Sequence, residues 1–73
     1  MALSDLDKKI VLMLFKVNFE SEFKLSSDLN MSPGFIEYHL EFLLKMGLID
    51  KVSNPSLTSA GRAYVVEKGL AAN

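Results

Sequence analysis

The sequence has no cysteine and a single histidine, His39, among its 73 residues. A disulfide or thiolate metal site is excluded, because both require cysteine sulfur. A zinc site built from several histidines is excluded on the same count, and the chain carries no paired acid and base, activated nucleophile or glycine-rich phosphate loop. We therefore expect a protein that binds no metal, uses no cofactor and is not an enzyme.

Long apolar runs and an excess of charge of either sign are also missing. No stretch approaches the roughly 20 apolar residues that span a bilayer, and the N-terminal segment carries two aspartates and no cation, unlike a signal peptide. Eight Lys and Arg against nine Asp and Glu give a net charge of -1, which attracts neither nucleic acid nor anionic membrane over long distances. We expect a cytoplasmic protein without membrane contact, in which nucleic-acid binding depends on local placement of cations.

The residues that are present are sufficient for one small globular domain. Hydrophobic residues make up 49% of the chain and charged residues 23%, which is typical of folded proteins. A chain of this size buries only about 60% of its unfolded surface, so its stability is marginal and a partner surface can add to it. We expect a single domain over residues 1–73.

A first helix is predicted over residues 5–17, before a break in the pattern at residues 18–20. A preceding serine can cap it, and two aspartates in its first turn suit the positive end of the helix dipole. Val11, Leu12 and Phe15 lie outside the main apolar stripe, so the helix is apolar around most of its circumference. Two interpretations are open: these residues form a dimer contact, or Val11 and Phe15 pack beneath the C-terminal helix.

Capping residues predict two further helices joined by a tight turn. Ser21 offers an N-cap for a short second helix, and Asn30 suits the left-handed turn that ends it. Ser32 and Pro33 favour a helix start, because a hydroxyl caps the helix and the N–H that proline lacks has no helical partner there. This third helix is expected to extend to about Met46, with a glycine turn after it.

Helical periodicity divides the third helix into an inward face, a flank and an outward face. The inward face is expected to carry Ile36, Leu40, Leu43 and Leu44, with His39 as a partly buried packing residue at its edge. The flank carries Phe35, Phe42 and Met46. The outward face carries Gly34, Glu37, Tyr38, Glu41 and Lys45, and the spacing of Glu41 and Lys45 favours an ion pair between them.

Residues 48–52 and 56–58 are predicted to form a β-hairpin around a Ser-Asn-Pro turn. A last helix is expected to follow, with Thr58 as its N-cap and Gly69 as its C-terminal turn. The tail at residues 70–73 is expected to be frayed. The predicted fold is therefore mainly α, with a three-helix core, a small β-hairpin and a C-terminal helix.

Two short helices joined by a tight corner, then a hairpin and a capped helix, form the helix-turn-helix arrangement with a wing. The motifs in question are Leu25-Ser26, Leu29-Asn30-Met31-Ser32-Pro33, Ile36, Leu40, Leu43, Gly47-Leu48-Ile49, Leu57-Thr58 and Gly61-Arg62. On these motifs, residues 21–68 resemble the winged helix-turn-helix repressors of the MarR and ArsR type. The resemblance makes the third helix the recognition helix and residues 51–56 the wing.

The resemblance implies a transcriptional regulator that binds double-stranded DNA. Early exposed residues of the recognition helix would enter the major groove, its N-terminus with the Ser32 hydroxyl would bind a phosphate, and nearby cations would add contacts. The implied DNA-binding residues are Lys24, Ser32, Gly34, Phe35, Glu37, Tyr38, Lys45, Lys51, Asn54 and Arg62. Because only about three to five phosphates would be neutralised per protomer, we expect a homodimer, which doubles the contacts.

A second hypothesis uses the same fold as a protein-interaction module. The recognition helix carries two glutamates and no arginine, and an apolar patch with a charged rim is typical of a partner site. Such a patch would consist of Phe35, Tyr38, Phe42 and Met46, rimmed by Glu37 and Glu41. The predicted protein-interface residues, for dimer and partner together, are Val11, Leu12, Phe15, Phe42 and Met46.

Overall fold

The computed structural model describes residues 3–17 and 21–70, and these ranges contain four helices. They are α1 (Asp5–Lys16), α2 (Glu22–Leu29), α3 (Pro33–Lys45) and α4 (Ser59–Glu67). The predicted break at residues 18–20 and the predicted frayed tail at residues 71–73 lie outside the described residues.

All four helices begin at the hydroxyl residues that the sequence predicts. Ser4, Ser21, Ser32 and Thr58 have extended backbones, and each side-chain oxygen accepts the backbone N–H three residues further on. Such a bond satisfies one of the amides that have no partner in the first turn of a helix. The N-caps therefore fix the start of each helix locally.

Left-handed residues end the second, third and fourth helices, as predicted. Asn30 follows α2 with φ 55°, Gly47 follows α3 with φ 78°, and Gly69 follows α4 with φ 65°. The Leu70 N–H then donates to the Val65 carbonyl at 3.0 Å. Leu70 is held at the end of α4 and half-buried, so the prediction of fraying is wrong for this residue.

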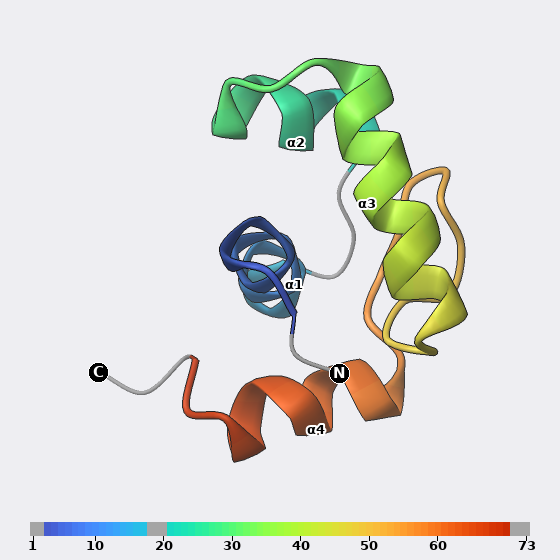
Figure 1. The fold of residues 1–73 in the computed structure, drawn as a ribbon. Coiled ribbons are helices and arrows are strands. Elements are labelled where there is room, and N and C mark those ends of the chain that lie inside the picture. Colours follow the sequence, from blue (N-terminus) through green and yellow to red (C-terminus); the bar gives the residue numbers. More distant parts are fainter. Residues whose placement is uncertain (1–2, 18–20, 71–73) are drawn as a thin grey trace.

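The helices pack as two pairs around one core. In Figure 1, α1 lies in the middle, with α2 and α3 around one side of it and α4 along the other. The closest helix pairs are α2 with α3 and α1 with α4. The buried apolar residues come from all four helices, from the residue ahead of the α1 N-cap and from the segment before α4: Leu3, Ile10, Val11, Leu14, Leu25, Ile36, Leu40, Leu43, Leu48, Ile49, Leu57 and Val65.

The predicted β-hairpin is reduced to one antiparallel bridge, between Ile49 and Leu57, in the described part of the chain. Two N–H groups that would extend the pairing have other acceptors. The Leu48 N–H donates to the Leu43 carbonyl and closes the end of α3, while the Ser56 N–H donates to the Asp50 carboxylate. The predicted strands are therefore wrong as regular elements, although the chain still reverses between them.

Two predicted assignments of apolar residues also need correction. Val11 is fully buried in the core and is not available for a dimer contact, in agreement with the alternative that it packs within the fold. Leu44 was expected on the inward face of α3 but is 40% exposed, whereas Ile36, Leu40 and Leu43 are fully buried. The neighbouring helices cover a narrower stripe of α3 than its apolar pattern suggests.

Candidate nucleic-acid interface

The start of α3 is an exposed helix N-terminus on the outside of the molecule. The Ser32 hydroxyl accepts the Phe35 N–H at 3.3 Å, and Pro33 occupies the first helical position. A Cβ added to Gly34 would meet no atom within 4 Å, so the backbone can be approached closely there. Free amides and the positive end of the helix dipole favour an anion at this position.

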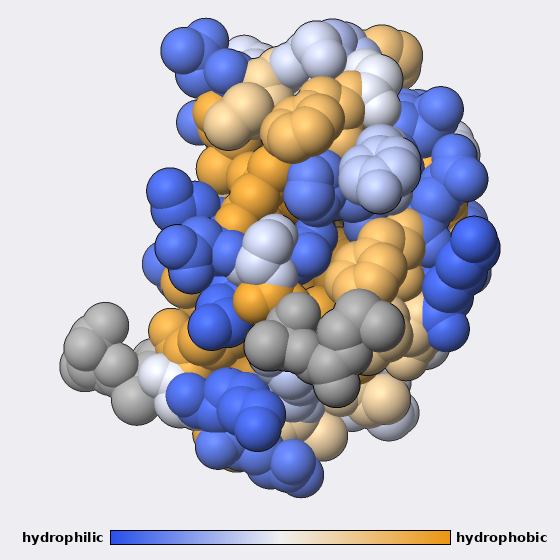
Figure 2. Space-filling view, viewed as in Figure 1, coloured by the Kyte–Doolittle hydropathy of each residue, from blue (hydrophilic) through white to orange (hydrophobic). Residues whose placement is uncertain are grey.

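The outward face of α3 is exposed as the periodicity predicts. Gly34, Glu37, Tyr38, Glu41 and Lys45 are all exposed, and Tyr38 is 70% accessible. Figure 2 shows hydrophilic residues along the side of the molecule that α3 and the segment after it form. In the described ranges no ion pair joins Glu41 to Lys45, so that predicted pair is absent. The face presents two carboxylates, a phenol and one ammonium group to solvent.

The apolar flank of α3 is partly covered. Phe35 is 45% exposed and Met46 is 38% exposed, while Phe42 is half-buried. Leu12 and Phe15 of α1 are also half-buried, and the Arg62 guanidinium of α4 lies 5.7 Å from the Phe15 ring centre. Arg62 thus contacts an aromatic ring of α1, a cation–π arrangement that brings α1 and α4 together.

The cations that the resemblance implies for DNA lie at different places. Lys24 on α2 pairs with Asp28 at 3.0 Å. Lys45 is exposed near the end of α3, and Lys51 is exposed at the start of the wing segment. Asn54 lies at the wing tip with φ 50°, which an asparagine tolerates better than most residues. These groups are exposed on α2, at the end of α3 and in the wing segment.

Asp50 organises the base of the wing. Its carboxylate accepts the Ser56 backbone N–H and the Ser56 hydroxyl, both at 3.0 Å. Those bonds, led by the one from the backbone N–H, hold the pKa of Asp50 below its usual value. The wing is therefore a loop fixed at its base by a carboxylate and a backbone bridge.

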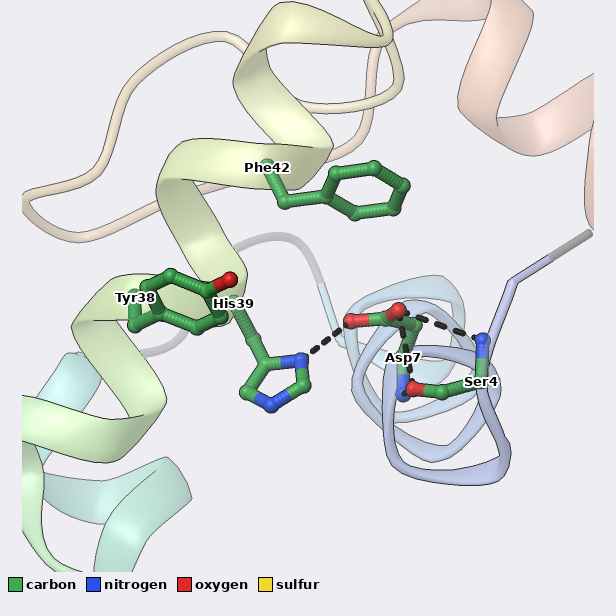
Figure 3. Close-up of a pocket in the computed structure, with 5 residues that line it drawn as sticks. All are labelled: Ser4, Asp7, Tyr38, His39 and Phe42. Carbon is green, nitrogen blue, oxygen red and sulfur yellow. Dashed lines mark hydrogen bonds and ion pairs between the residues drawn. The ribbon is translucent and has the colours of Figure 1, made fainter. Parts of the chain in front are cut away.

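A contact that the sequence did not reveal joins α1 to α3. Asp7 and His39 point toward each other in Figure 3, with 2.7 Å between Asp7 Oδ1 and His39 Nδ1. A hollow of about 200 Å³ beside them is lined by Ser4, Tyr38 and Phe42 as well. His39 is partly buried as predicted, but it has a specific polar partner. In the sequence, only the position of His39 at the edge of the inward face could have indicated such a partner.

No helix in residues 3–17 and 21–70 is long and apolar enough to cross a membrane. The arrangement of α2, the left-handed turn at Asn30, α3 and the following loop is that of a helix-turn-helix protein. The family model for the bacterial regulatory proteins of the arsR family matches residues 8–51. The chain belongs to this family.

Solved structures show the same fold. A probable transcriptional regulator from Pseudomonas aeruginosa superposes with a TM-score of 0.80 and 24% identity over 96% of this chain. Wild-type ZitR from Lactococcus lactis superposes with a TM-score of 0.75 and 24% identity over 97% of it. The chain spans 59% and 56% of the length of these two proteins, respectively. No curated protein sequence matches it.

Proposed function

We propose that this chain is a small DNA-binding transcriptional regulator, with α3 as the recognition helix in the major groove. The observation that carries the proposal is the turn at Asn30. Its left-handed backbone ends α2, and Ser32 restarts the chain as α3 with Gly34, Glu37 and Tyr38 exposed. A helix set across its predecessor in this way can enter the groove with its first two turns. Membership of the arsR family and the matched regulator from Pseudomonas aeruginosa support this function.

The charges of this chain make DNA binding depend on local contacts more than on general attraction. The net charge is -1 and the exposed face of α3 carries Glu37 and Glu41, so general attraction to DNA is weak. The proposed phosphate contacts come from the amides at the start of α3, from Lys45 at its end and from Lys51 in the wing segment. A glutamate on such a face can accept a hydrogen bond from cytosine N4, which favours recognition of sequence over tight general binding.

The proposed active form is a homodimer that uses α1 and α4. Val17 at the end of α1 is 40% exposed and Val66 of α4 is 67% exposed, and half-buried Leu12 and Phe15 lie on α1. Two copies double the number of phosphate contacts, which a protomer with few cations requires. Two recognition helices then contact two half-sites one helical turn apart.

A salt titration with a labelled DNA duplex tests this function. The affinity is expected to fall steeply as salt increases from about 50 mM, because each phosphate contact releases counterions. Lys51→Ala is expected to weaken binding to all sequences and to lower the salt slope by about one. Lys9→Ala, an exposed cation on α1, serves as the matched control and is expected to bind like the wild type. Absence of binding at about 50 mM salt by a folded chain would refute the proposal.

The exposed aromatic residues of α3 favour protein interaction as a second candidate function. Tyr38 is 70% exposed and Phe35 is 45% exposed, beside the carboxylates of Glu37 and Glu41. Tyrosine and phenylalanine are enriched in protein interfaces, and the acidic rim suits a basic partner. Tyr38→Ala and Phe42→Ala would then abolish partner capture. If both variants keep every partner while Lys51→Ala weakens DNA binding, this second function is excluded.

A further inference from the structure

Asp7 and His39 connect the two helix pairs of the fold. Asp7 belongs to α1, which packs mainly on α4, and His39 belongs to α3, which packs mainly on α2. The two residues are 32 positions apart, whereas the hydrogen bonds between Ser56 and Asp50 side chains and between Ser4 and Asp7 side chains are local. The Asp7–His39 contact thus links the recognition helix to the part of the molecule proposed to dimerise.

The carboxylate of Asp7 is fixed before it meets the histidine. Its Oδ2 atom accepts the Ser4 backbone N–H at 3.2 Å and the Ser4 hydroxyl at 2.9 Å, which completes a capping box at the start of α1. Oδ1 is left for His39, and the side chain is only 5% exposed. The acceptor is therefore rigid, and its charge is stabilised by the helix N-terminus.

The imidazole of His39 is held by two aromatic rings on the exposed side of α3. It makes edge-to-face contacts with Phe35, at 4.7 Å between ring centres, and with Tyr38, at 5.5 Å. Both are predicted DNA-contacting residues. The imidazole thus packs directly against two side chains of the proposed recognition surface.

The second ring nitrogen of His39 is open to proton exchange. Every buried polar side-chain atom of the described residues has a hydrogen-bond partner, and none of these residues bonds to Nε2. Nε2 therefore reaches solvent. When Nδ1 donates to Asp7, Nε2 of the neutral ring is an acceptor that can take up a proton.

We propose that Asp7 and His39 position the recognition helix against α1, and that protonation of His39 tightens this link and, with it, DNA binding. For its DNA consequence the inference rests on the proposed function. Protonation converts a neutral hydrogen bond to Asp7 into a charge-assisted one, which is shorter and stronger. The neutral ring still donates a hydrogen bond to Asp7 through Nδ1, so deprotonation weakens the link without breaking it.

The residues that line the hollow beside the imidazole include one carboxylate and no second cation, so protonation of His39 adds attraction there and no repulsion. The hollow beside it is lined by Ser4, Asp7, Tyr38 and Phe42. Asp7 from α1 and the Tyr38 phenol from α3 are thus the titratable groups of this lining that face the ring. His39 is also the one histidine of the chain, so a transition between about pH 5 and 8 that is lost with this residue can be assigned to it.

The link is tested first without DNA, by following backbone amide NMR shifts from about pH 8 to about pH 6. In the wild type, amides in the first turn of α1 and in the middle of α3 are expected to move with one common midpoint. Asp7→Asn keeps an acceptor at the same place but removes the charge, so the α1 shifts are expected to vanish while the α3 shifts remain. Asp5→Asn, an exposed acid in the same turn, is the matched control and should behave like the wild type.

The second test measures the affinity for a labelled random-sequence duplex of about two helical turns at the same two pH values and constant salt. The wild type and Asp5→Asn are expected to bind about fivefold more tightly at the lower pH, a coupling at the low end of the usual range. In Asp7→Asn and His39→Gln this ratio is expected to fall to about one. Thermal melts establish that each variant is folded.

The two tests separate the inference from the proposed function. If the wild type binds DNA equally at both pH values, or if His39→Gln keeps the wild-type ratio, the inference is overturned and DNA binding stands. If the folded wild type binds no DNA, the proposed function fails, and the NMR titration alone decides on the link. Shifts of α1 that stay unchanged in Asp7→Asn would overturn the link itself.

Discussion

Gly61 of α4 lies directly against the carbonyl oxygen of Leu48, so that a Cβ added to Gly61 would overlap this backbone atom. The Leu57 side chain would also lie within 3.0 Å of the added Cβ. We expect Gly61→Ala to destabilise the fold by about 1–3 kcal/mol, because α4 would have to move away from the chain segment beneath it. Urea denaturation followed by circular dichroism measures the change.

Gly34→Ala is the matched control for this prediction. The position lies in the first turn of α3, and an added Cβ meets nothing within 4 Å. The substitution is expected to stabilise the fold by about 0.5–1 kcal/mol, since alanine has the higher helix propensity and restricts the unfolded chain. If Gly61→Ala shifts the denaturation midpoint in the same direction as Gly34→Ala, the close contact at Leu48 does not exist in solution.

The helices were predictable because single capping residues determine where each helix begins and ends. Ser32 and Pro33 start α3, and Asn30 ends α2 through its own backbone preference, without reference to distant parts of the chain. The hairpin was not predictable in the same way. The Leu48 N–H that should extend the strand pairing is taken by the Leu43 carbonyl at the end of α3, a competition that the alternating pattern cannot reveal.

The turn between α2 and α3 depends on the left-handed backbone of Asn30. Its φ of 55° costs a β-branched residue about 1–2 kcal/mol. Asn30→Val is therefore expected to lower the free energy of unfolding by about this amount, whereas Asn30→Gly is expected to leave it unchanged or slightly raised. Thermal and urea denaturation of the two variants provide the measurement. Equal stability of both would mean that the turn has another geometry.

The wing base is expected to weaken in acid. The bonds from Ser56 lower the pKa of Asp50 in the folded state, so its ionised form stabilises the fold above about pH 4, the unfolded value. This contribution is lost as the pH falls through the lower, folded-state pKa. Asp50→Asn is expected to melt below the wild type at neutral pH, with the gap closing on acidification. A gap that stays constant with pH would contradict this account.

The proposed dimer predicts a specific effect at α4. Val66 is 67% exposed, so Val66→Lys is expected to change the stability of one chain by no more than about 0.5 kcal/mol while it separates the two copies. Sedimentation equilibrium is expected to give one chain for this variant and two for the wild type. Glu37→Lys, on the exposed face of α3, is the control and should sediment as the wild type does. A wild type that sediments as a single chain would contradict the dimer.

The sequence predicted which α3 residues of the candidate site are exposed. It did not predict the contact between Asp7 and His39 that lies behind them. Periodicity is sufficient to place Glu37 and Tyr38 outward, because they lie opposite the apolar stripe of an amphipathic helix. The contact between Asp7 and His39 depends on how two helices far apart in sequence cross, which no local pattern encodes. Val11 was misassigned for the same reason, since its cover comes from the packing of the whole fold.

The hydroxyl of Thr58 serves two helix ends at once. It donates to the Gly47 carbonyl at 2.6 Å and accepts the Gly61 N–H at 3.1 Å. We therefore expect the last turn of α3 and the first turn of α4 to open and close as one cooperative unit. Amide hydrogens of Leu48 and Gly61 should exchange with deuterium at the same opening free energy, while the amide of Asn54 at the wing tip exchanges independently and sooner.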